Sequence, residues 1–201
     1  MSIIKIENLS FSYPTSYDAV FENICFQIDT DWKLGLIGRN GRGKTTLLKL
    51  LLGQYEYSGR IIHSVTFDYF PYVVKDRSGL TLEVLEEICC AAEWELTREL
   101  SYLDVDDESL FKAILKKMGF ERVQFEKRIS EFSEGQKKKV QLAKSLCEQA
   151  HLYLWDELLN FIDIDSRIQI EALIKDFSPT LLLVEHDCAF RESVATKTIS
   201  L

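Results

Sequence analysis

The sequence predicts an α/β protein with a mainly parallel sheet, an antiparallel β part at the N-terminus and a small helical lobe. Three observations support this fold class. A glycine-rich loop at 38–45 lies between the apolar run 34–37 and the helical stretch 46–52. Strand-like apolar runs alternate with amphipathic helical stretches near the C-terminus, which is typical of parallel sheets. The N-terminal segment alternates apolar and polar residues, as half-buried strands do.

The expected strands share short runs of branched, aliphatic or aromatic residues. In chain order they are 3–9, 24–28, 34–37, 59–70, 152–155, 180–184 and 198–201. A turn at Tyr13–Ser16 separates the first two strands, because proline and serine favour turns. The longer β segment 59–70 gains its strand character from Ile61, Ile62, Val65 and Phe67.

The expected helices show apolar residues at helical spacing. The first helix is 46–52, and Gly53 is placed to cap its C-terminus. Residues 81–117 turn helical, with Leu110–Met118 as a second helical stretch. Residues 132–136 lead into a helix expected over Lys137–Cys147, and in a further helix Ile170, Leu173, Ile174 and Phe177 share one face.

The 201 residues suit one α/β domain with an ordinary core. We expect a single domain spanning 1–201, in which 1–78 and 133–201 form the core and about 79–132 form the helical lobe. The sequence contains no apolar run of the roughly 18 residues that a membrane span needs, and its N-terminus lacks the layout of a signal peptide. We therefore expect no direct insertion into a membrane.

Charge and cysteine content restrict the class of protein further. The net charge of −8 argues against indiscriminate binding of nucleic acid. Lys137-Lys138-Lys139 is a dense basic run, which predicts either a local basic surface or an ordinary solvated helix face. The five cysteines show no C-x-x-C spacing, so reduced thiols in a cytoplasmic protein are expected.

The strongest motif is Gly38-Arg39-Asn40-Gly41-Arg42-Gly43-Lys44-Thr45, which matches the phosphate-loop pattern G-x-x-x-x-G-K-[ST]. Between a strand and a helix N-terminus, the N–H groups of such a loop converge on an anion, and glycines let the backbone approach the phosphates. Lys44 would reach the β- and γ-phosphates, and the Thr45 hydroxyl would ligate Mg²⁺. The motif predicts nucleotide binding, with Thr46 included in the site; the alternative is a plain glycine turn before a buried helix.

Two strand ends add carboxylates and a histidine. The apolar strand that starts at Leu152 ends in Asp156 and Glu157. Asp156 would hold Mg²⁺ through water, and Glu157 would act as general base or position the attacking water. His186 follows the strand 180–184 and would contact the γ-phosphate. Read alone, the two acids would be a solvated loop and the histidine a structural residue.

A second helix start carries polar groups that suit a phosphate. Ser133, Gly135 and Gln136 lead into the helix that ends at Cys147, so a hydroxyl, free N–H groups and the helix dipole lie together. The alternative is that Ser133 is an ordinary N-cap.

The order of these motifs resembles the nucleotide-binding domain of the ATP-binding cassette (ABC) family from end to end. The matching positions are Tyr13 for the aromatic that stacks on adenine, 38–45 for the phosphate loop, Ser133, Gly135 and Gln136 for the signature, Glu157 for the catalytic glutamate, Asp163 for the D-loop and His186 for the switch histidine. The resemblance implies that two cassettes close head-to-tail, so that each signature covers the nucleotide on the other phosphate loop. The implied partner is a second ABC cassette, either a second copy or another chain.

A finer resemblance is to the ABC-F class, which lacks transmembrane domains and acts on the ribosome. The run 156–163 keeps an asparagine, Asn160, typical of that class, and 32–43 is also similar to ABC-F proteins, notably those that confer antibiotic resistance. Those proteins carry two cassettes in one chain. Here the sequence through Asp104 looks more like their first cassette and the sequence from Phe120 more like their second, as in a shortened or spliced relative.

Three positions depart from the family pattern. Tyr72 stands where the family has the Mg²⁺-contacting glutamine, and a phenol is a poorer and bulkier ligand. Leu158 replaces the proline after the catalytic glutamate, and Glu134 replaces the first glycine of the signature. These departures weaken the expectation of rapid hydrolysis more than that of nucleotide binding.

The resemblance and the residues together predict an ATPase that binds and hydrolyses MgATP at a head-to-tail interface and acts on the ribosome in the manner of ABC-F proteins. One alternative is the ATPase subunit of a membrane transporter, which would pair with a transmembrane subunit. Another is a shortened cassette that binds ATP without hydrolysing it.

Overall fold

A computed structural model provides the structure of the chain and describes residues 3–14, 16–29, 31–71, 108–127, 131–147, 150–160 and 162–201. The chain divides into two compact units. The first unit contains Met1–Asp68, Ala150–Leu158 and Ser178–Leu201, and the second contains Tyr69–Gln149 and Leu159–Phe177. The helical pattern expected between 81 and 107 lies outside the described residues.

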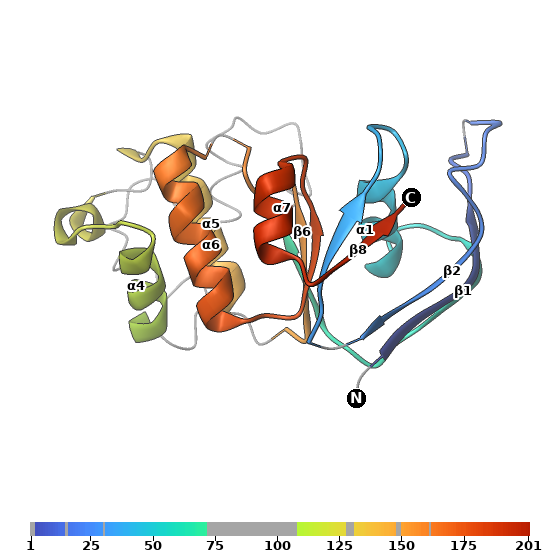
Figure 1. The fold of residues 1–201 in the computed structure, drawn as a ribbon, viewed down its shortest axis with the longest axis horizontal. Helices are drawn as coiled ribbons and strands as arrows, with labels where there is room; N and C mark the ends of the chain where they lie inside the picture. The colour runs from blue at the N-terminus through green and yellow to red at the C-terminus, as the bar shows by residue number, and fades with distance from the viewer. Residues whose placement is uncertain are drawn as a thin grey trace. The chain divides into compact units, whose positions relative to one another are not determined.

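The N-terminal part of the first unit is a three-stranded antiparallel sheet with the order β2-β1-β4 (Figure 1). Its strands are β1 (Ile3–Phe11), β2 (Phe21–Asp29) and β4 (Ser58–Ile62). Between β1 and β2 the expected turn is present, because the N–H of Ser16 donates to the carbonyl of Tyr13 at 2.9 Å. The antiparallel β part that the sequence predicts is therefore confirmed.

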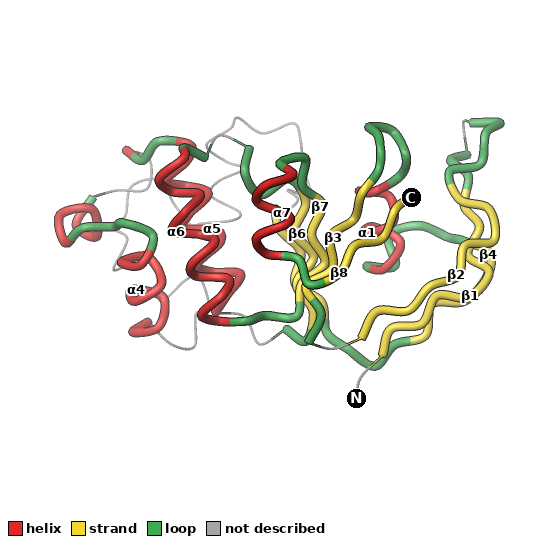
Figure 2. Tube along the Cα trace, viewed as in Figure 1, coloured by secondary structure: helices red, strands yellow, loops and turns green. Residues whose placement is uncertain are grey.

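The second sheet has five strands in the order β5-β6-β7-β3-β8. They are β5 (Phe67–Phe70), β6 (Leu152–Asp156), β7 (Leu181–Val184), β3 (Lys33–Ile37) and β8 (Lys197–Ser200). β3 pairs in parallel with β7 and β8, and β6 pairs in parallel with β7 (Figure 2). The mainly parallel sheet is thus confirmed.

The β segment expected over 59–70 is divided between the two sheets. β4 pairs with β1, whereas β5 is the edge strand next to β6. One straight strand cannot pair with both sheets, so the chain breaks at residues 63–66, where the ring of His63 approaches the carbonyl of Val65 at 3.2 Å.

Apolar side chains bury the parallel strands on both faces. All residues of β6 and β7 are buried, and Trp155 of β6 has no exposed surface. Two helices of the first unit, α1 (Lys44–Leu51) and α7 (Cys188–Val194), lie on opposite sides of this sheet (Figure 1). Such two-sided burial is typical of parallel sheets.

The short helix α7 was not predicted from the sequence. Its seven residues are too few to show a clear apolar period. Its start is nevertheless encoded locally, because the Asp187 carboxylate accepts a hydrogen bond from the N–H of Phe190 at 2.9 Å as an N-cap.

The second unit is helical. It contains α4 (Glu108–Lys117), the short 3₁₀ helix η1 (Arg122–Glu126), α5 (Glu134–Cys147) and α6 (Ile164–Phe177). Three of the four residues expected to share one face of α6 are buried, namely Ile170, Leu173 and Ile174. Lys117 of α4 pairs with Asp176 of α6 at 2.6 Å. Among the described helices, none is long and apolar enough to cross a membrane.

The contact between β1 and β4 requires a glycine. Gly59 has φ of 101°, and a Cβ added there would lie 2.3 Å from the carbonyl oxygen of Asn8. Asn8 itself has φ of 50°, where the register of β1 with β2 shifts. The bulge in β1 therefore brings its backbone so close to β4 that only a residue without a Cβ fits.

We predict that Gly59→Ala lowers the free energy of unfolding by roughly 3 kcal/mol or more, because it adds a backbone clash to the cost of a left-handed conformation. Gly53→Ala is the matched control, since Gly53 has φ of 68° with nothing within 4 Å of an added Cβ. That control should cost only about 1 kcal/mol. Urea unfolding followed by circular dichroism measures both values, and equal losses would contradict the steric explanation.

Candidate nucleotide-binding site

Three neighbouring parallel strands of the first unit end at the same edge of the sheet. In the order β6-β7-β3, they lead into Glu157, into His186 and into the phosphate loop at 38–45. The pairs Leu36–Val184 and Asp156–Val184 align the carboxyl ends of the strands. Ligands of open α/β sheets bind outside the carboxyl ends of the strands, so the register alone places these three segments around one site.

These segments line a pocket of about 340 Å³. Its walls come entirely from the first unit: Tyr13, Val20, Asn40, Gly41, Gly43, Lys44, Thr45, Thr46, Glu157, Val184 and His186. Nine of the residues that the sequence singled out thus lie together. Val20 and Val184 were not predicted, because an isolated valine carries no sequence signal for a binding role.

The phosphate loop meets α1 at a position that only glycine can occupy. Gly43 has φ of 87°, and an added Cβ would lie 2.5 Å from Val20 and 2.7 Å from Phe21. Within the described part of the chain, no side chain caps α1, and the first turn carries no acidic residue. The positive end of the helix dipole therefore remains available to an anion.

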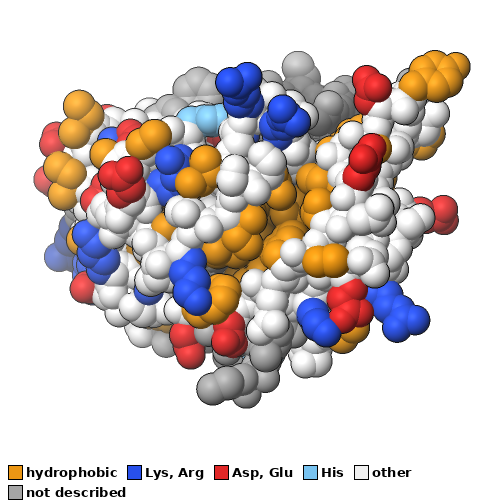
Figure 3. Space-filling view, turned by 45° about the vertical axis from the view of Figure 1, so that its right-hand side comes forward, with side chains coloured by type: hydrophobic (Ala, Val, Ile, Leu, Met, Phe, Trp, Pro, Cys, Tyr) orange, Lys and Arg blue, Asp and Glu red, His pale blue; other side chains and the backbone are white. Residues whose placement is uncertain are grey.

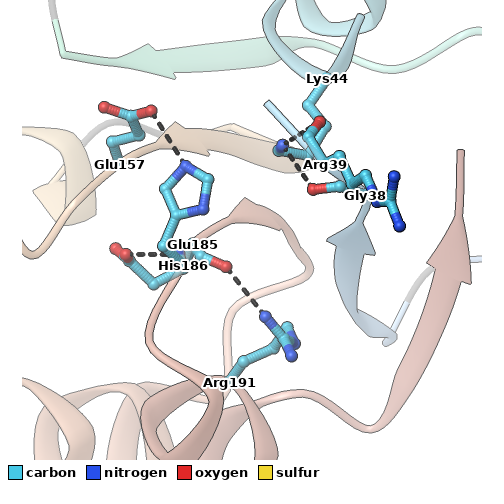
Figure 4. Close-up of polar contacts among 7 residues, drawn as sticks. All are labelled: Gly38, Arg39, Lys44, Glu157, Glu185, His186 and Arg191. Carbon is cyan, nitrogen blue, oxygen red and sulfur yellow. Dashed lines mark hydrogen bonds and ion pairs between the residues drawn. The ribbon is translucent and has the colours of Figure 1, made fainter. Parts of the chain in front are cut away.

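Lys44 is the charged group of the loop. Its side chain is largely buried, and its Nζ donates to the carbonyl oxygens of Gly38 at 2.8 Å and Arg39 at 3.2 Å (Figure 4). These two residues therefore shape the site through their backbone. A phosphate oxygen would compete for the same ammonium protons, and it would bind more strongly because it carries a full negative charge.

Glu157 and His186 face each other across the strand ends (Figure 4). The Nε2 of His186 lies 3.4 Å from the Oε1 of Glu157, and both side chains are almost half exposed. Glu157 has φ of 53°, which is rare for a residue other than glycine, and its N–H donates to the carbonyl of Val184 at 2.8 Å. Such a conformation costs of order 1 kcal/mol or more and is common at functional sites.

Tyr13 is held in an aromatic cluster that the sequence did not reveal. Its hydroxyl lies 2.8 Å from the hydroxyl of Thr46 in α1. Its ring packs edge-on against Phe11, with centroids 5.0 Å apart, and against Tyr55, with centroids 5.7 Å apart. Tyr55 lies forty-two positions after Tyr13 (55 − 13 = 42), so only the fold brings the two rings together.

A second hollow in the first unit has a different character. It measures about 330 Å³ and is lined mainly by apolar side chains of β2 and the C-terminal end, including Phe21, Phe26, Ile199 and Leu201. Figure 3 shows hydrophobic side chains gathered in a hollow of the surface. Arg42 lines this second hollow rather than the first, so its side chain points away from the candidate site.

The residues expected to hold Mg²⁺ provide suitable oxygen ligands. Thr45 lines the pocket, and Asp156 is the buried last residue of β6. Within the described ranges, no three acidic, histidine or cysteine side chains cluster into a metal site of their own. A hydroxyl and one carboxylate suit Mg²⁺, which usually takes few protein ligands and completes its shell with phosphates and water.

Ser133, Gly135 and Gln136 lie in the second unit, at the start of α5. The N–H of Gln136 donates to the Ser133 hydroxyl at 3.2 Å, and the N–H of Ser133 donates to the Gln136 side chain at 3.0 Å. This reciprocal pair is a capping box. The pocket of the first unit does not include these residues.

The basic run at the start of α5 does not form a free basic surface. Lys137 pairs with Glu134 at 2.8 Å, and Lys138 lies over the ring of Phe70 at 5.9 Å. Lys139 donates to the carbonyl of Met118 at 2.7 Å, and burial lowers the pKa of Lys139. Each lysine thus has a partner within the second unit.

Asp163 caps the N-terminus of α6. Its carboxylate accepts hydrogen bonds from the hydroxyl of Ser166 at 2.6 Å and from the N–H of Ser166 at 2.8 Å. These bonds favour the charged form and lower the pKa of Asp163.

Of the positions that depart from the family pattern, Leu158 is buried, whereas Tyr72 lies outside the described residues.

Comparison with known proteins assigns the chain to a family. A family model described as "ABC transporter" matches residues 21–160. The chain is 30% identical over 196 residues to ATP-binding cassette sub-family F member 2 of Bos taurus, covering 96% of this chain and 30% of that protein. It is 29% identical over 202 residues to the ribosome protection protein VmlR of Bacillus subtilis (strain 168), covering 98% of this chain and 34% of that protein.

A solved structure supports the same fold. The chain superposes with a TM-score of 0.72 and 25% identity on a chain from the complex of the archaeal ribosomal stalk protein aP1 with the ribosome recycling factor aABCE1. The match covers all of this chain and 37% of that one. The chain spans 28% to 36% of the length of the curated relatives that it matches.

We predict that Tyr55→Ala weakens nucleotide binding about three- to tenfold, because edge-to-face ring pairs contribute roughly 0.5–1.5 kcal/mol. Without Tyr55, the Tyr13 ring would lose one of the two rings that orient it. Titration with a fluorescent ATP analogue measures the dissociation constant. Tyr55→Phe is the control that keeps the ring, and unchanged affinity in Tyr55→Ala would show that Tyr13 does not depend on this contact.

We predict that Asp163→Ala lowers the free energy of unfolding by about 1 kcal/mol through loss of the helix cap, and that Asp163→Asn costs less because it keeps a cap oxygen. The pKa of Asp163 is lowered in the fold. The advantage of wild type over Asp163→Asn is therefore present above the unfolded-state pKa and is lost as the pH falls through the folded-state pKa. Urea unfolding across acidic pH measures this difference; a pH-independent difference would exclude the charge contribution.

Proposed function

The chain belongs to the ABC transporter family, and on that premise we propose that it is an ATPase that binds MgATP and hydrolyses it between two cassettes. One observation carries the proposal: the phosphate loop, Glu157 and His186 line the same pocket. In phosphoryl transfer to water, a lysine-bearing loop binds the phosphates and a further side chain positions the attacking water, which supports these roles for Lys44 and Glu157.

Different residues of the pocket bind the phosphates, the base and Mg²⁺. The N–H groups of the loop and the Lys44 ammonium bind the β- and γ-phosphates. The base stacks on Tyr13, whose ring is oriented by its aromatic neighbours. Mg²⁺, when held by Thr45 and Asp156, supplies positive charge that offsets the charge of the phosphate oxygens.

The carboxylate and the imidazole act on the water. Glu157 orients the attacking water and accepts its proton as the oxygen bonds to the γ-phosphorus. The bond from that phosphorus to the bridging oxygen breaks, and ADP and inorganic phosphate are the products. His186, 3.4 Å from Glu157, donates a hydrogen bond to the γ-phosphate and links its presence to the position of the carboxylate.

The second unit supplies groups for a partner cassette. We infer that Ser133, Gly135 and Gln136 cover the nucleotide bound by a second cassette, as the family resemblance implies. Glu134 brings a carboxylate to this surface, but Lys137 pairs with it at 2.8 Å and offsets its charge. Release of that lysine toward a phosphate would break a pair in which the Glu134 side chain is 68% exposed and the Lys137 side chain 14% exposed, and a charge-assisted bond to the phosphate would replace it.

We further propose that the partner beyond the second cassette is the ribosome. The support is the names of the relatives, which include a ribosome protection protein and a sub-family F cassette protein, and the Asn160 in the segment after Glu157. A further support is the likeness to a chain from the complex of an archaeal ribosomal stalk protein with a ribosome recycling factor.

We predict that Glu157→Gln lowers kcat for ATP hydrolysis about 100-fold or more while nucleotide binding persists, because the variant cannot accept the proton of the water. Lys44→Ala should weaken ATP binding at least tenfold, since it removes a charge-assisted contact to phosphate. Phosphate release and equilibrium titration measure the two effects. Lys49→Ala, in the same helix but outside the pocket, is the matched control; unchanged hydrolysis in both pocket variants would overturn the proposed ATPase.

We predict that the Glu157→Gln protein sediments with ribosomes in the presence of MgATP and not without it, because the variant retains ATP in the closed state. Lys44→Ala should abolish this sedimentation at ATP concentrations near the wild-type dissociation constant, since it weakens ATP binding. If ATP binds but nothing sediments, the ribosome proposal fails; co-purification with a transmembrane protein would then favour a transporter subunit.

A further inference from the structure

The loop that carries His186 is held by side chains that hydrogen-bond to its backbone. It joins β7 to α7 and consists of Glu185, His186 and Asp187. The N–H of His186 donates to the Oε1 of Glu185 at 2.7 Å. The carbonyl oxygen of Glu185 accepts a hydrogen bond from the Nη1 of Arg191 at 3.0 Å (Figure 4).

These two hydrogen bonds act on the same peptide group. The carbonyl of Glu185 and the N–H of His186 belong to one planar peptide unit, so holding both ends fixes the orientation of the plane. The direction of the His186 Cβ follows from that plane and from one further backbone dihedral angle. Arg191 therefore restricts where the imidazole of His186 can point.

Arg191 is itself held on both sides. Its Nη2 donates to the Sγ of Cys188 at 3.3 Å. Its aliphatic stem packs against Gly35 in β3, where an added Cβ would lie 3.0 Å from both the Cγ and the Cδ of Arg191. β3 runs directly into the phosphate loop. One side chain thus contacts the strand before that loop and the loop before α7.

We propose that Arg191 is a positioning residue that orients His186 toward Glu157 during hydrolysis. This inference rests on the proposed ATPase function. Arg191 does not line the nucleotide pocket, so it acts through the peptide between Glu185 and His186 and not on the substrate. A guanidinium suits this role because it stays charged and donates in fixed directions.

Arg191→Met tests the proposal by removing the donors while keeping most of the aliphatic stem. We expect kcat for ATP hydrolysis to fall about tenfold, the effect of losing roughly one charge-assisted hydrogen bond, with KM for ATP unchanged. Arg191→Lys should recover part of kcat, because an ammonium can still donate to the carbonyl. Glu192→Gln, on an exposed neighbour in α7, is the matched control. Thermal unfolding confirms that each variant is folded; equal kcat in wild type and Arg191→Met overturns the proposal.

A second test uses Gly35 and does not remove Arg191. Gly35→Ala places a methyl group against the Arg191 stem and should displace it by a few tenths of an ångström. We expect a smaller loss of kcat in the same direction, and no further loss when Gly35→Ala is combined with Arg191→Met. Fully additive losses would show that the two residues act independently.

A third measurement separates failure of this inference from failure of the proposed function, because it needs no hydrolysis. The His186 ring gives a ¹H–¹³C correlation peak that can be assigned by its disappearance in His186→Asn. In otherwise wild-type protein, Glu157→Gln should shift this peak, since the two side chains lie 3.4 Å apart. In the Arg191→Met background that shift should be lost, and its persistence would overturn the positioning role whether or not the protein hydrolyses ATP.

Discussion

The parallel pairing of β6, β7 and β3 is the constraint on which the candidate site depends. The register places Val184 beside both Leu36 and Asp156, so the three strands end together at one edge of the sheet. Apolar side chains bury these strands, and the sheet cannot shift without exposing them. Hydrophobic packing therefore determines where the lysine, the carboxylate and the imidazole lie, although none of those groups takes part in it.

Local backbone conformation at Gly43 and Glu157 then directs the loop and the carboxylate that follow the strands. Gly43 starts α1 in a left-handed conformation, which turns the phosphate loop over the end of the helix. Glu157 adopts a left-handed conformation without being a glycine, and its N–H is held by the carbonyl of Val184 at 2.8 Å. The same strand thus anchors the carboxylate through Val184 and the imidazole through the loop that follows. Two catalytic candidates share one rigid support, which favours a fixed distance between them.

The sequence predicted the parts of the fold and of the pocket that short contiguous patterns encode. The phosphate loop is such a pattern, because its spacing and its flanking strand and helix lie within some twenty residues. The strands before Glu157 and His186 are recognisable because each is a short apolar run that ends in polar residues. The contacts of Tyr55 with Tyr13 and of Arg191 with Gly35 could not be predicted, since they join segments that only the fold brings together. The helix α7 was too short to show a period, and β4 and β5 looked continuous because both are rich in β-forming residues.

Two of the departures from the family pattern are accommodated within the chain. Leu158 lacks the fixed φ of proline, but its side chain is 1% exposed, and burial of a leucine contributes roughly 1.5–3 kcal/mol. Packing of the Leu158 side chain can thus hold the turn after Glu157, as the ring of a proline would. Glu134 brings a carboxylate to the start of α5, yet the Lys137 ammonium lies 2.8 Å away. Since a paired carboxylate repels an approaching phosphate less than a lone one, both substitutions are compatible with the proposed hydrolysis.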